Sequence, residues 1–166
     1  MNEALGKLAH EAGLSEPRGD TLRYAFAYAC ANRVRHLLEQ PRAIACLDVL
    51  RDFVEGRASL PHLEAAASEA AQVANQHQGS PSIDGTDHAA VSATFTVAKA
   101  VAGQALEAAS YAAYAIVYAY GRYAVNDSSA FEPEFAWQAQ TLRELARLPR
   151  YSEPATLPAA PPSTPR

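Results

Sequence analysis

Apolar residues recur at spacings of three and four residues through most of this chain, and alanine supplies many of them. Such spacing places the apolar side chains on one face of an α-helix, so that this face can pack against a core. Alanine is the best helix former and has a small side chain, so helices lined by it can approach each other closely. The pattern therefore predicts an all-α bundle without strands. The clearest stretch has its apolar positions at Leu22, Phe26, Ala29, Cys30, Val34, Leu37 and Leu38.

Turn and capping residues divide this pattern into about seven helices. Gly56 is expected to end a helix, and Pro41 favours the first turn of one. The pattern between Asp87 and Ala124 is too long for one ordinary globular helix, so Gly103 near its middle predicts a break. The expected helices cover residues 3–12, 21–40, 41–55, 59–76, 87–102, 104–124 and 133–148.

The length of 166 residues is typical of a single domain. We expect one helical domain over residues 1–148. The sequence from Pro149 onward is rich in proline, alanine and serine, which cannot build a core, so residues 149–166 are expected to form a disordered tail. Residues 78–85 form the longest expected internal loop and are the candidate for a flexible tip.

Charge and hydropathy narrow the classes of partner. The net charge is −4 and the isoelectric point is about 5.7, which disfavours binding to a phosphate backbone, where clustered Lys and Arg are needed. No apolar stretch is long enough to span a membrane, and the first residues lack the apolar segment of a signal peptide. We therefore expect a cytoplasmic protein that binds neither nucleic acid nor membrane.

Catalytic and metal-binding motifs are missing from the sequence. It has no GxGxxG, P-loop or GxSxG pattern, and its histidines form no HExxH pair. Cys30 and Cys46 lie among apolar neighbours in expected helices, without the spacing of zinc ligands, and are expected to be buried thiols. We expect no enzymatic activity, no metal and no cofactor.

The tyrosines are the most unusual feature of the sequence. Tyr111, Tyr114 and Tyr118 are spaced by three and four, so they share one face of a helix, while Tyr120 and Tyr123 form a second pair on another face. Two interpretations are open. The rings could bind a protein partner, since tyrosine is enriched at binding hot spots, or they could fill space in an alanine-rich core.

Two groups of acidic residues complete the candidate sites. Asp48, Asp52 and Glu55 are spaced by four and three on one expected helix. They form either a solvated helix face or an acidic patch that steers a basic protein partner. Glu107 is the one acidic residue in the long apolar run, which makes it the candidate for a buried charge.

Three segments of the chain resemble a known family. They are residues 22–34 (LRYAFAYACANRV), the two ends of residues 42–59 (RAI and FVEGRAS), and residues 102–112 (AGQALEAASYA). Together they resemble the alanine-rich helical immunity proteins found beside bacterial polymorphic toxins, and related uncharacterised helical bacterial proteins, over about residues 22–148. The resemblance implies a bacterial, non-enzymatic protein that binds and blocks a toxin.

Two functions therefore compete. One is an immunity-type inhibitor that binds a protein toxin through the tyrosines or the acidic cluster. The other is a helical module that binds a small ligand or forms a homo-oligomer, supported by the slim alanine faces and by the aromatic residues near Glu107. A pocket beside the tyrosines is the structural feature that the second function requires.

Overall fold

The computed structural model describes residues 2–77 and 86–152, and these residues form helices and connecting turns without a strand. The expected all-α fold is confirmed. Four short 3₁₀ turns, at residues 17–19, 35–37, 124–126 and 128–131, lie between the α-helices. The α-helices are α1 (Glu3–Glu11), α2 (Asp20–Arg33), α3 (Pro41–Val54), α4 (Leu60–Gln76), α5 (Thr86–Val101), α6 (Ala105–Ala119), α7 (Glu132–Ala146) and α8 (Pro149–Ser152).

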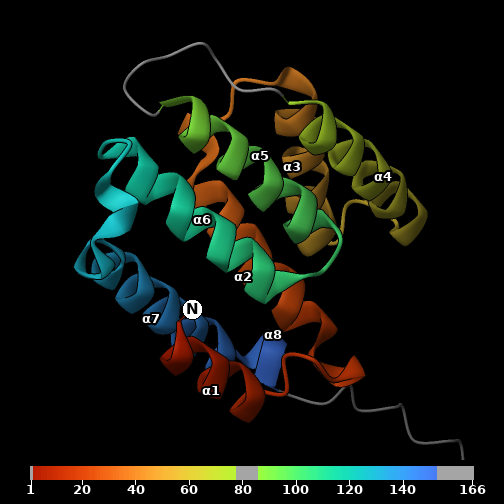
Figure 1. Cartoon of the computed structure of the whole chain (residues 1–166). Helices are drawn as coiled ribbons and strands as arrows, with labels where there is room; N and C mark the ends of the chain where they lie inside the picture. The colour runs from red at the N-terminus through yellow and green to blue at the C-terminus, as the bar shows by residue number, and fades with distance from the viewer. Residues whose placement is uncertain (1, 78–85, 153–166) are drawn as a thin grey trace, which may run out of the picture.

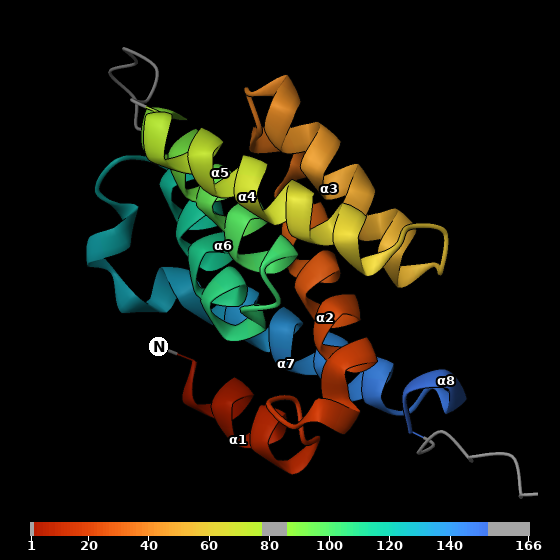
Figure 2. The same ribbon diagram turned by 90° about the vertical axis from the view of Figure 1, so that its right-hand side faces the viewer.

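Helix α2 lies at the centre of the bundle, where it packs against α3, α5, α6 and α7. Helices α5 and α6 form a pair that lies side by side (Figure 1). Helices α3 and α4 form a second pair, which also packs against α5. Helices α1, α7 and α8 lie at the end of the bundle opposite α3 and α4 (Figure 2). The three groups enclose a core to which α2 contributes Leu22, Ala25, Phe26, Ala27, Cys30 and Ala31.

Alanine lines the contacts in the middle of the bundle, as the sequence predicted. Phe26, which is fully buried, is one of the few large side chains among these small ones. Small side chains let helix backbones approach closely, so the packing is dense although few bulky residues take part. The buried alanines of α6 are Ala105, Ala108, Ala109, Ala112, Ala113 and Ala115.

Gly103 forms the predicted break between α5 and α6. Its φ is +74°, a left-handed conformation that side-chain-bearing residues rarely adopt. The backbone N–H of Gln104 donates to the carbonyl oxygen of Lys99 at 2.9 Å, which closes the end of α5. A Cβ at position 103 would lie 2.9 Å from the hydroxyl oxygen of Tyr24. Backbone conformation and close packing therefore both require glycine here.

Two expected helices end earlier than predicted. Helix α2 stops at Arg33, and residues 35–37 continue as a single 3₁₀ turn before Leu38 becomes extended. Helix α6 stops at Ala119, just before Gly121 with its φ of +141°. Apolar spacing does not distinguish an α-turn from a 3₁₀ turn, so the periodic pattern overestimated both helices.

The helical part of the chain continues past residue 148, where the sequence predicted that the domain ends. Residues 149–152 form α8, which packs against α7, instead of beginning a disordered tail. The remainder of the expected tail, residues 153–166, and the expected loop at 78–85 lie outside the described residues. No described helix is both long enough and apolar enough to cross a membrane.

Candidate functional site

Tyr111, Tyr114 and Tyr118 lie along one side of α6, as their spacing predicted. The side chain of Tyr114 is 44 % exposed, whereas Tyr111 and Tyr118 are half-buried. Two of the rings help to cover the bundle, and the ring between them is exposed. The exposure of Tyr114 is compatible with the first interpretation, and the partial burial of Tyr111 and Tyr118 with the second.

Neighbouring rings extend this cluster across three helices and a turn. Tyr111 stacks on Phe95 of α5, with the ring centroids 5.3 Å apart, and Tyr118 lies 5.1 Å from the ring of His88. Tyr114 meets the ring of Phe131 edge-on at 5.1 Å, and such aromatic pairs favour a fixed ring orientation. We call the surface formed by Tyr111, Tyr114, Tyr118, Phe131 and Phe135 the aromatic face.

Three further large apolar side chains of α6 and of the segment after it are exposed. Tyr120 is 68 % exposed and Tyr123 is 76 % exposed, just beyond the end of α6. Leu106, in the first turn of the same helix, is 40 % exposed. Leu106 and Tyr114 line one hollow, and exposed apolar groups that cluster are typical of an interaction surface, whereas single exposed ones are ordinary.

A hollow of about 580 Å³ opens beside Tyr114. Its walls come from α1, from α6, from the segment at residues 125–131 and from α7. Polar groups of Glu107, Ser110 and Asn126 also reach it. We call this hollow the α6 pocket. Its apolar lining includes Leu5, Leu106, Val125, Phe131 and Phe135.

Glu107 is not the buried charge that the sequence suggested. Its side chain is exposed at the rim of the α6 pocket. The prediction was wrong because α6 carries apolar residues on more than one face. The core-facing positions are taken by alanines such as Ala108 and Ala112, while Glu107 lies on the stripe of Tyr111 and Tyr114.

The three carboxylates on α3 lie together, as their spacing predicted. Each of them pairs with an arginine, so they do not form an uncompensated acidic patch. Asp48 accepts from Arg35 at 2.8 Å, and Asp52 accepts from Arg57 at 2.7 Å. The hydrogen bond from Arg57 holds the pKa of Asp52 below its usual range. Arg51 bridges Asp48 and Asp52, and Arg57 also pairs with Glu55.

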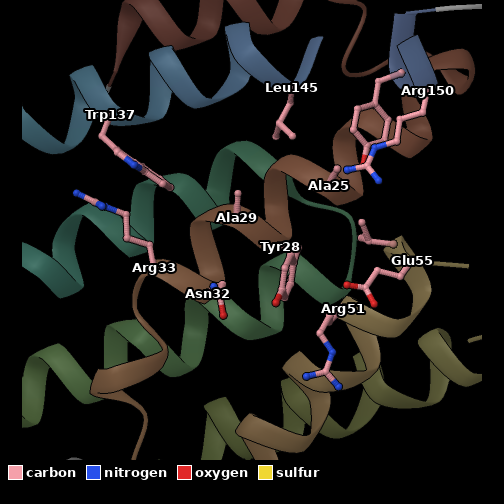
Figure 3. A pocket seen from close by; sticks show the side chains of 12 residues that line it. Ala25, Tyr28, Ala29, Asn32, Arg33, Arg51, Glu55, Trp137, Leu145 and Arg150 are labelled. Carbon is pink, nitrogen blue, oxygen red and sulfur yellow. The ribbon is translucent and has the colours of Figure 1, made fainter. Parts of the chain in front are cut away.

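A second hollow, of about 430 Å³, lies between α2, α3, α7 and α8. Arg33, Arg51 and Arg150 line it from three different helices (Figure 3). The guanidinium of Arg33 lies 4.1 Å from the ring centre of Trp137. We call this hollow the arginine groove. Arg33 and Arg51 already pair with carboxylates, so part of its positive charge is compensated.

Among the described residues, the buried charge is Glu134, which sequence reasoning missed. Its side chain is 2 % exposed, and its Oε2 accepts from Arg33 Nε at 2.7 Å. Burial raises the pKa of this carboxyl, and the hydrogen bond from Arg33 opposes that shift. Sequence spacing contains no signal for the pair, because the two residues are 101 positions apart.

Side-chain amides form the floor of the α6 pocket. Gln138 is buried and donates through Nε2 to the carbonyl oxygen of Ala109 at 2.7 Å. Asn2 donates to the carbonyl oxygen of Phe135 at 3.0 Å, and its own side-chain oxygen caps α1 by accepting from the N–H of Leu5. These bonds tie α1, α6 and α7 together, so the pocket has a rigid floor.

No metal or nucleophilic centre emerges from the described residues. No group of three or more His, Cys, Asp or Glu side chains is placed there to hold a metal ion. Cys30 and Cys46 are buried free thiols, as the sequence predicted, and burial raises the pKa of each. A thiol held in this protonated form is a poor nucleophile.

Comparison with known proteins supports the resemblance seen in the sequence. A family model matches residues 15–145, a range that includes α2, the α5–α6 pair with its aromatic face, and almost all of α7. No curated protein and no solved structure matches the chain. The chain belongs to the Imm-5 like putative immunity protein family.

Proposed function

We propose that this protein is a non-enzymatic inhibitor that binds and blocks a protein toxin, and that the aromatic face with the adjoining α6 pocket is its binding surface. One observation carries the proposal: the exposed ring of Tyr114 lines a pocket on the surface of a protein of the immunity family.

Tyrosine suits such a surface for physical reasons. Its ring buries a large apolar area, its hydroxyl can hydrogen-bond, and only two side-chain torsions must be fixed on binding. Tyr114 is further held by its contact with Phe131, so little additional ordering is needed. A few such rings at the centre of an interface supply much of the binding energy.

We place the complex in the cytoplasm. Both cysteines are free thiols rather than a disulfide, which suits a reducing compartment. An inhibitor there would meet a toxin at the site where the toxin acts.

The test is to sequence the genes that neighbour the gene of this protein and to co-express the chain with a toxin encoded there. We expect the wild-type chain to restore growth, and the triple variant Tyr114→Ala, Tyr120→Ala, Tyr123→Ala to fail at equal expression level. The matched control is Leu60→Ala, because Leu60 is 52 % exposed but lies on α4, away from the aromatic face. Equal protection by the triple variant would refute the proposed surface.

The acidic cluster on α3 remains a second candidate surface for a basic partner. Its carboxylates are compensated by arginines, which weakens long-range attraction of a basic toxin. The variant Asp52→Asn distinguishes the two surfaces in the same growth assay. Lost protection by Asp52→Asn with full protection by the tyrosine variant would move the binding site to α3.

The α6 pocket also supports the competing function, a helical module that binds a small ligand. A hollow of about 580 Å³ lies within the range of small-molecule sites, which are mostly apolar with a few polar groups. Formation of a homo-oligomer through the aromatic face is the related alternative. Light scattering of the purified chain distinguishes a monomer from an oligomer, and mass spectrometry under native conditions detects a retained ligand.

A further inference from the structure

We propose that the α6 pocket receives a lysine or arginine side chain of the protein partner, with its apolar stem inside the pocket and its cation paired with Glu107. The inference rests on the proposed function and adds the chemistry that the partner must present. It follows from three independent features of the pocket: its lining, a glycine in its wall and its charge.

The lining suits a side chain that is apolar along its length and polar at its tip. Leu5, Phe131 and Phe135 form apolar walls, whereas Ser110 and Asn126 offer oxygen atoms near the rim. Lysine and arginine bury their alkyl stems against apolar surface while the charged end stays near water. The exposed polar groups of Ser110 and Asn126 suit an occupant whose polar end lies near them.

Gly6 in the wall is not explained by the packing of this chain. It lies inside α1, where glycine is disfavoured relative to alanine. A Cβ built at this position meets no atom within 4 Å, so the fold itself leaves room for a side chain. A glycine that lines a pocket lets a second molecule approach the helix backbone closely. The backbone of α1 at Gly6 is therefore accessible to a side chain that enters the α6 pocket.

The charge of the pocket selects a cation. Glu107 is the charged residue among those described residues that line the pocket. The side chain is exposed, and within the described part of the chain it makes no ion pair. The arginine groove is lined by Arg33, Arg51 and Arg150 and by one carboxylate, Glu55. Arg33 and Arg51 pair with carboxylates, so its positive charge is partly compensated. Of these two hollows, however, a basic side chain finds a carboxylate without an opposing arginine only in the described lining of the α6 pocket.

Three probes of similar length test the pocket: phenylbutylamine, phenylbutanol and phenylbutyrate. Each is titrated into the isotope-labelled full chain, and amide shifts are followed by NMR. We expect saturable shifts at Gly6, Glu107 and Ser110 with the amine, weaker binding of the alcohol and the weakest binding of the acid. The amine should bind about two- to fivefold more tightly than the alcohol, as expected for one partly exposed ion pair.

Two variants separate charge from shape. Glu107→Gln should remove the preference for the amine and leave binding of the alcohol unchanged. Gly6→Leu should abolish binding of the amine and the alcohol alike, because its side chain projects into the pocket. Glu64→Gln, an exposed carboxylate on α4, is the control for a general loss of negative charge. Circular dichroism checks that each variant keeps its helices.

A charge swap connects the pocket to the toxin. Glu107→Lys should reduce protection against the toxin at least tenfold more than Glu64→Lys, and a Lys-to-Glu or Arg-to-Glu change in the toxin should restore it.

The outcomes separate this inference from the proposed function. If the chain neutralises the toxin but the amine binds no better than the acid, or Glu107→Gln has no effect, the inference is wrong and the inhibitor function stands. If the amine binds as expected but the chain neutralises no toxin, the pocket binds cations that do not come from a toxin. In that case the proposed inhibitor function is wrong.

Discussion

Arg33, at the end of α2, donates through Nε to the buried carboxylate of Glu134 in the first turn of α7, with 2.7 Å between Nε and Oε2. The same guanidinium lies over the ring of Trp137 at 4.1 Å. The cation thus joins two helices that are far apart in the sequence. Glu134 depends on it, because a buried carboxylate without a partner is strongly destabilising.

Arg33→Ala should lower the free energy of unfolding by about 2–3 kcal/mol. A fully buried pair that loses one partner costs about 3–5 kcal/mol, and partial exposure of Arg33 reduces the effect. Urea unfolding followed by circular dichroism measures the change. Arg33→Lys should fall between wild type and alanine, since lysine keeps the charge but loses the planar contact with Trp137.

The control for this substitution is Arg143→Ala. Arg143 is an exposed arginine of α7 and has no ion pair within the described residues. Its removal should change stability by less than about 0.5 kcal/mol. Equal effects at the two positions would show that the contact with Glu134 contributes nothing specific.

Stability should depend on pH through Glu134. Burial raises the pKa of this carboxyl above its ordinary value of 4.5, so the folded chain binds the proton more tightly than the unfolded chain does. The resulting stabilisation is fully present below the ordinary pKa and is lost as pH rises through the raised one. The difference in unfolding free energy between wild type and Glu134→Gln should therefore decrease as pH rises from about 4 toward neutrality.

Glu132→Gln is the matched control for the pH series, because Glu132 lies in the same helical turn but is exposed. The difference in unfolding free energy between wild type and Glu132→Gln should show little pH dependence. If the corresponding difference for Glu134→Gln increases with pH, then Arg33, rather than burial, dominates the pKa of Glu134.

Two glycine-to-alanine substitutions should change stability in opposite directions. Gly103→Ala should destabilise by about 1–2 kcal/mol from its left-handed backbone alone, and contact with Tyr24 adds to this. Gly6→Ala should stabilise by up to about 1 kcal/mol, since alanine is the better helix former and nothing obstructs its Cβ. Thermal unfolding of both variants in the same buffer measures the two changes in melting temperature relative to wild type. If both changes have the same sign, the prediction is wrong.

Cys30 and Cys46 should resist thiol reagents in the native protein. Both are buried, and burial raises the pKa of each thiol, so the reactive thiolate is scarce and inaccessible. Labelling with a disulfide reagent should follow the unfolding transition in urea. Ser110→Cys places a thiol at an exposed position of α6 and should react at once in the folded state. Rapid native labelling of wild type would contradict the prediction.

Local sequence predicted those features that depend on neighbouring residues. The three- and four-residue spacing gave correct helices for α3 and α4. The length of the run at residues 87–124 predicted a break, and the glycine near its middle correctly placed that break at Gly103. The shared face of Tyr111, Tyr114 and Tyr118 follows from the same periodicity. Exposure could not be predicted in this way, because α6 is apolar on several faces and spacing alone does not say which one meets the core.

The sequence by itself determined the helices, their slim alanine faces and the grouping of tyrosines and carboxylates along single helices, since these depend on contacts within one or two turns. The tertiary structure decided that Glu107 is exposed, that Glu134 is buried against Arg33, and that residues of α1, α6 and α7 enclose one pocket. These features depend on how helices distant in the chain pack against each other. Burial and pairing across such distances arise only when the core forms, and no local pattern encodes them.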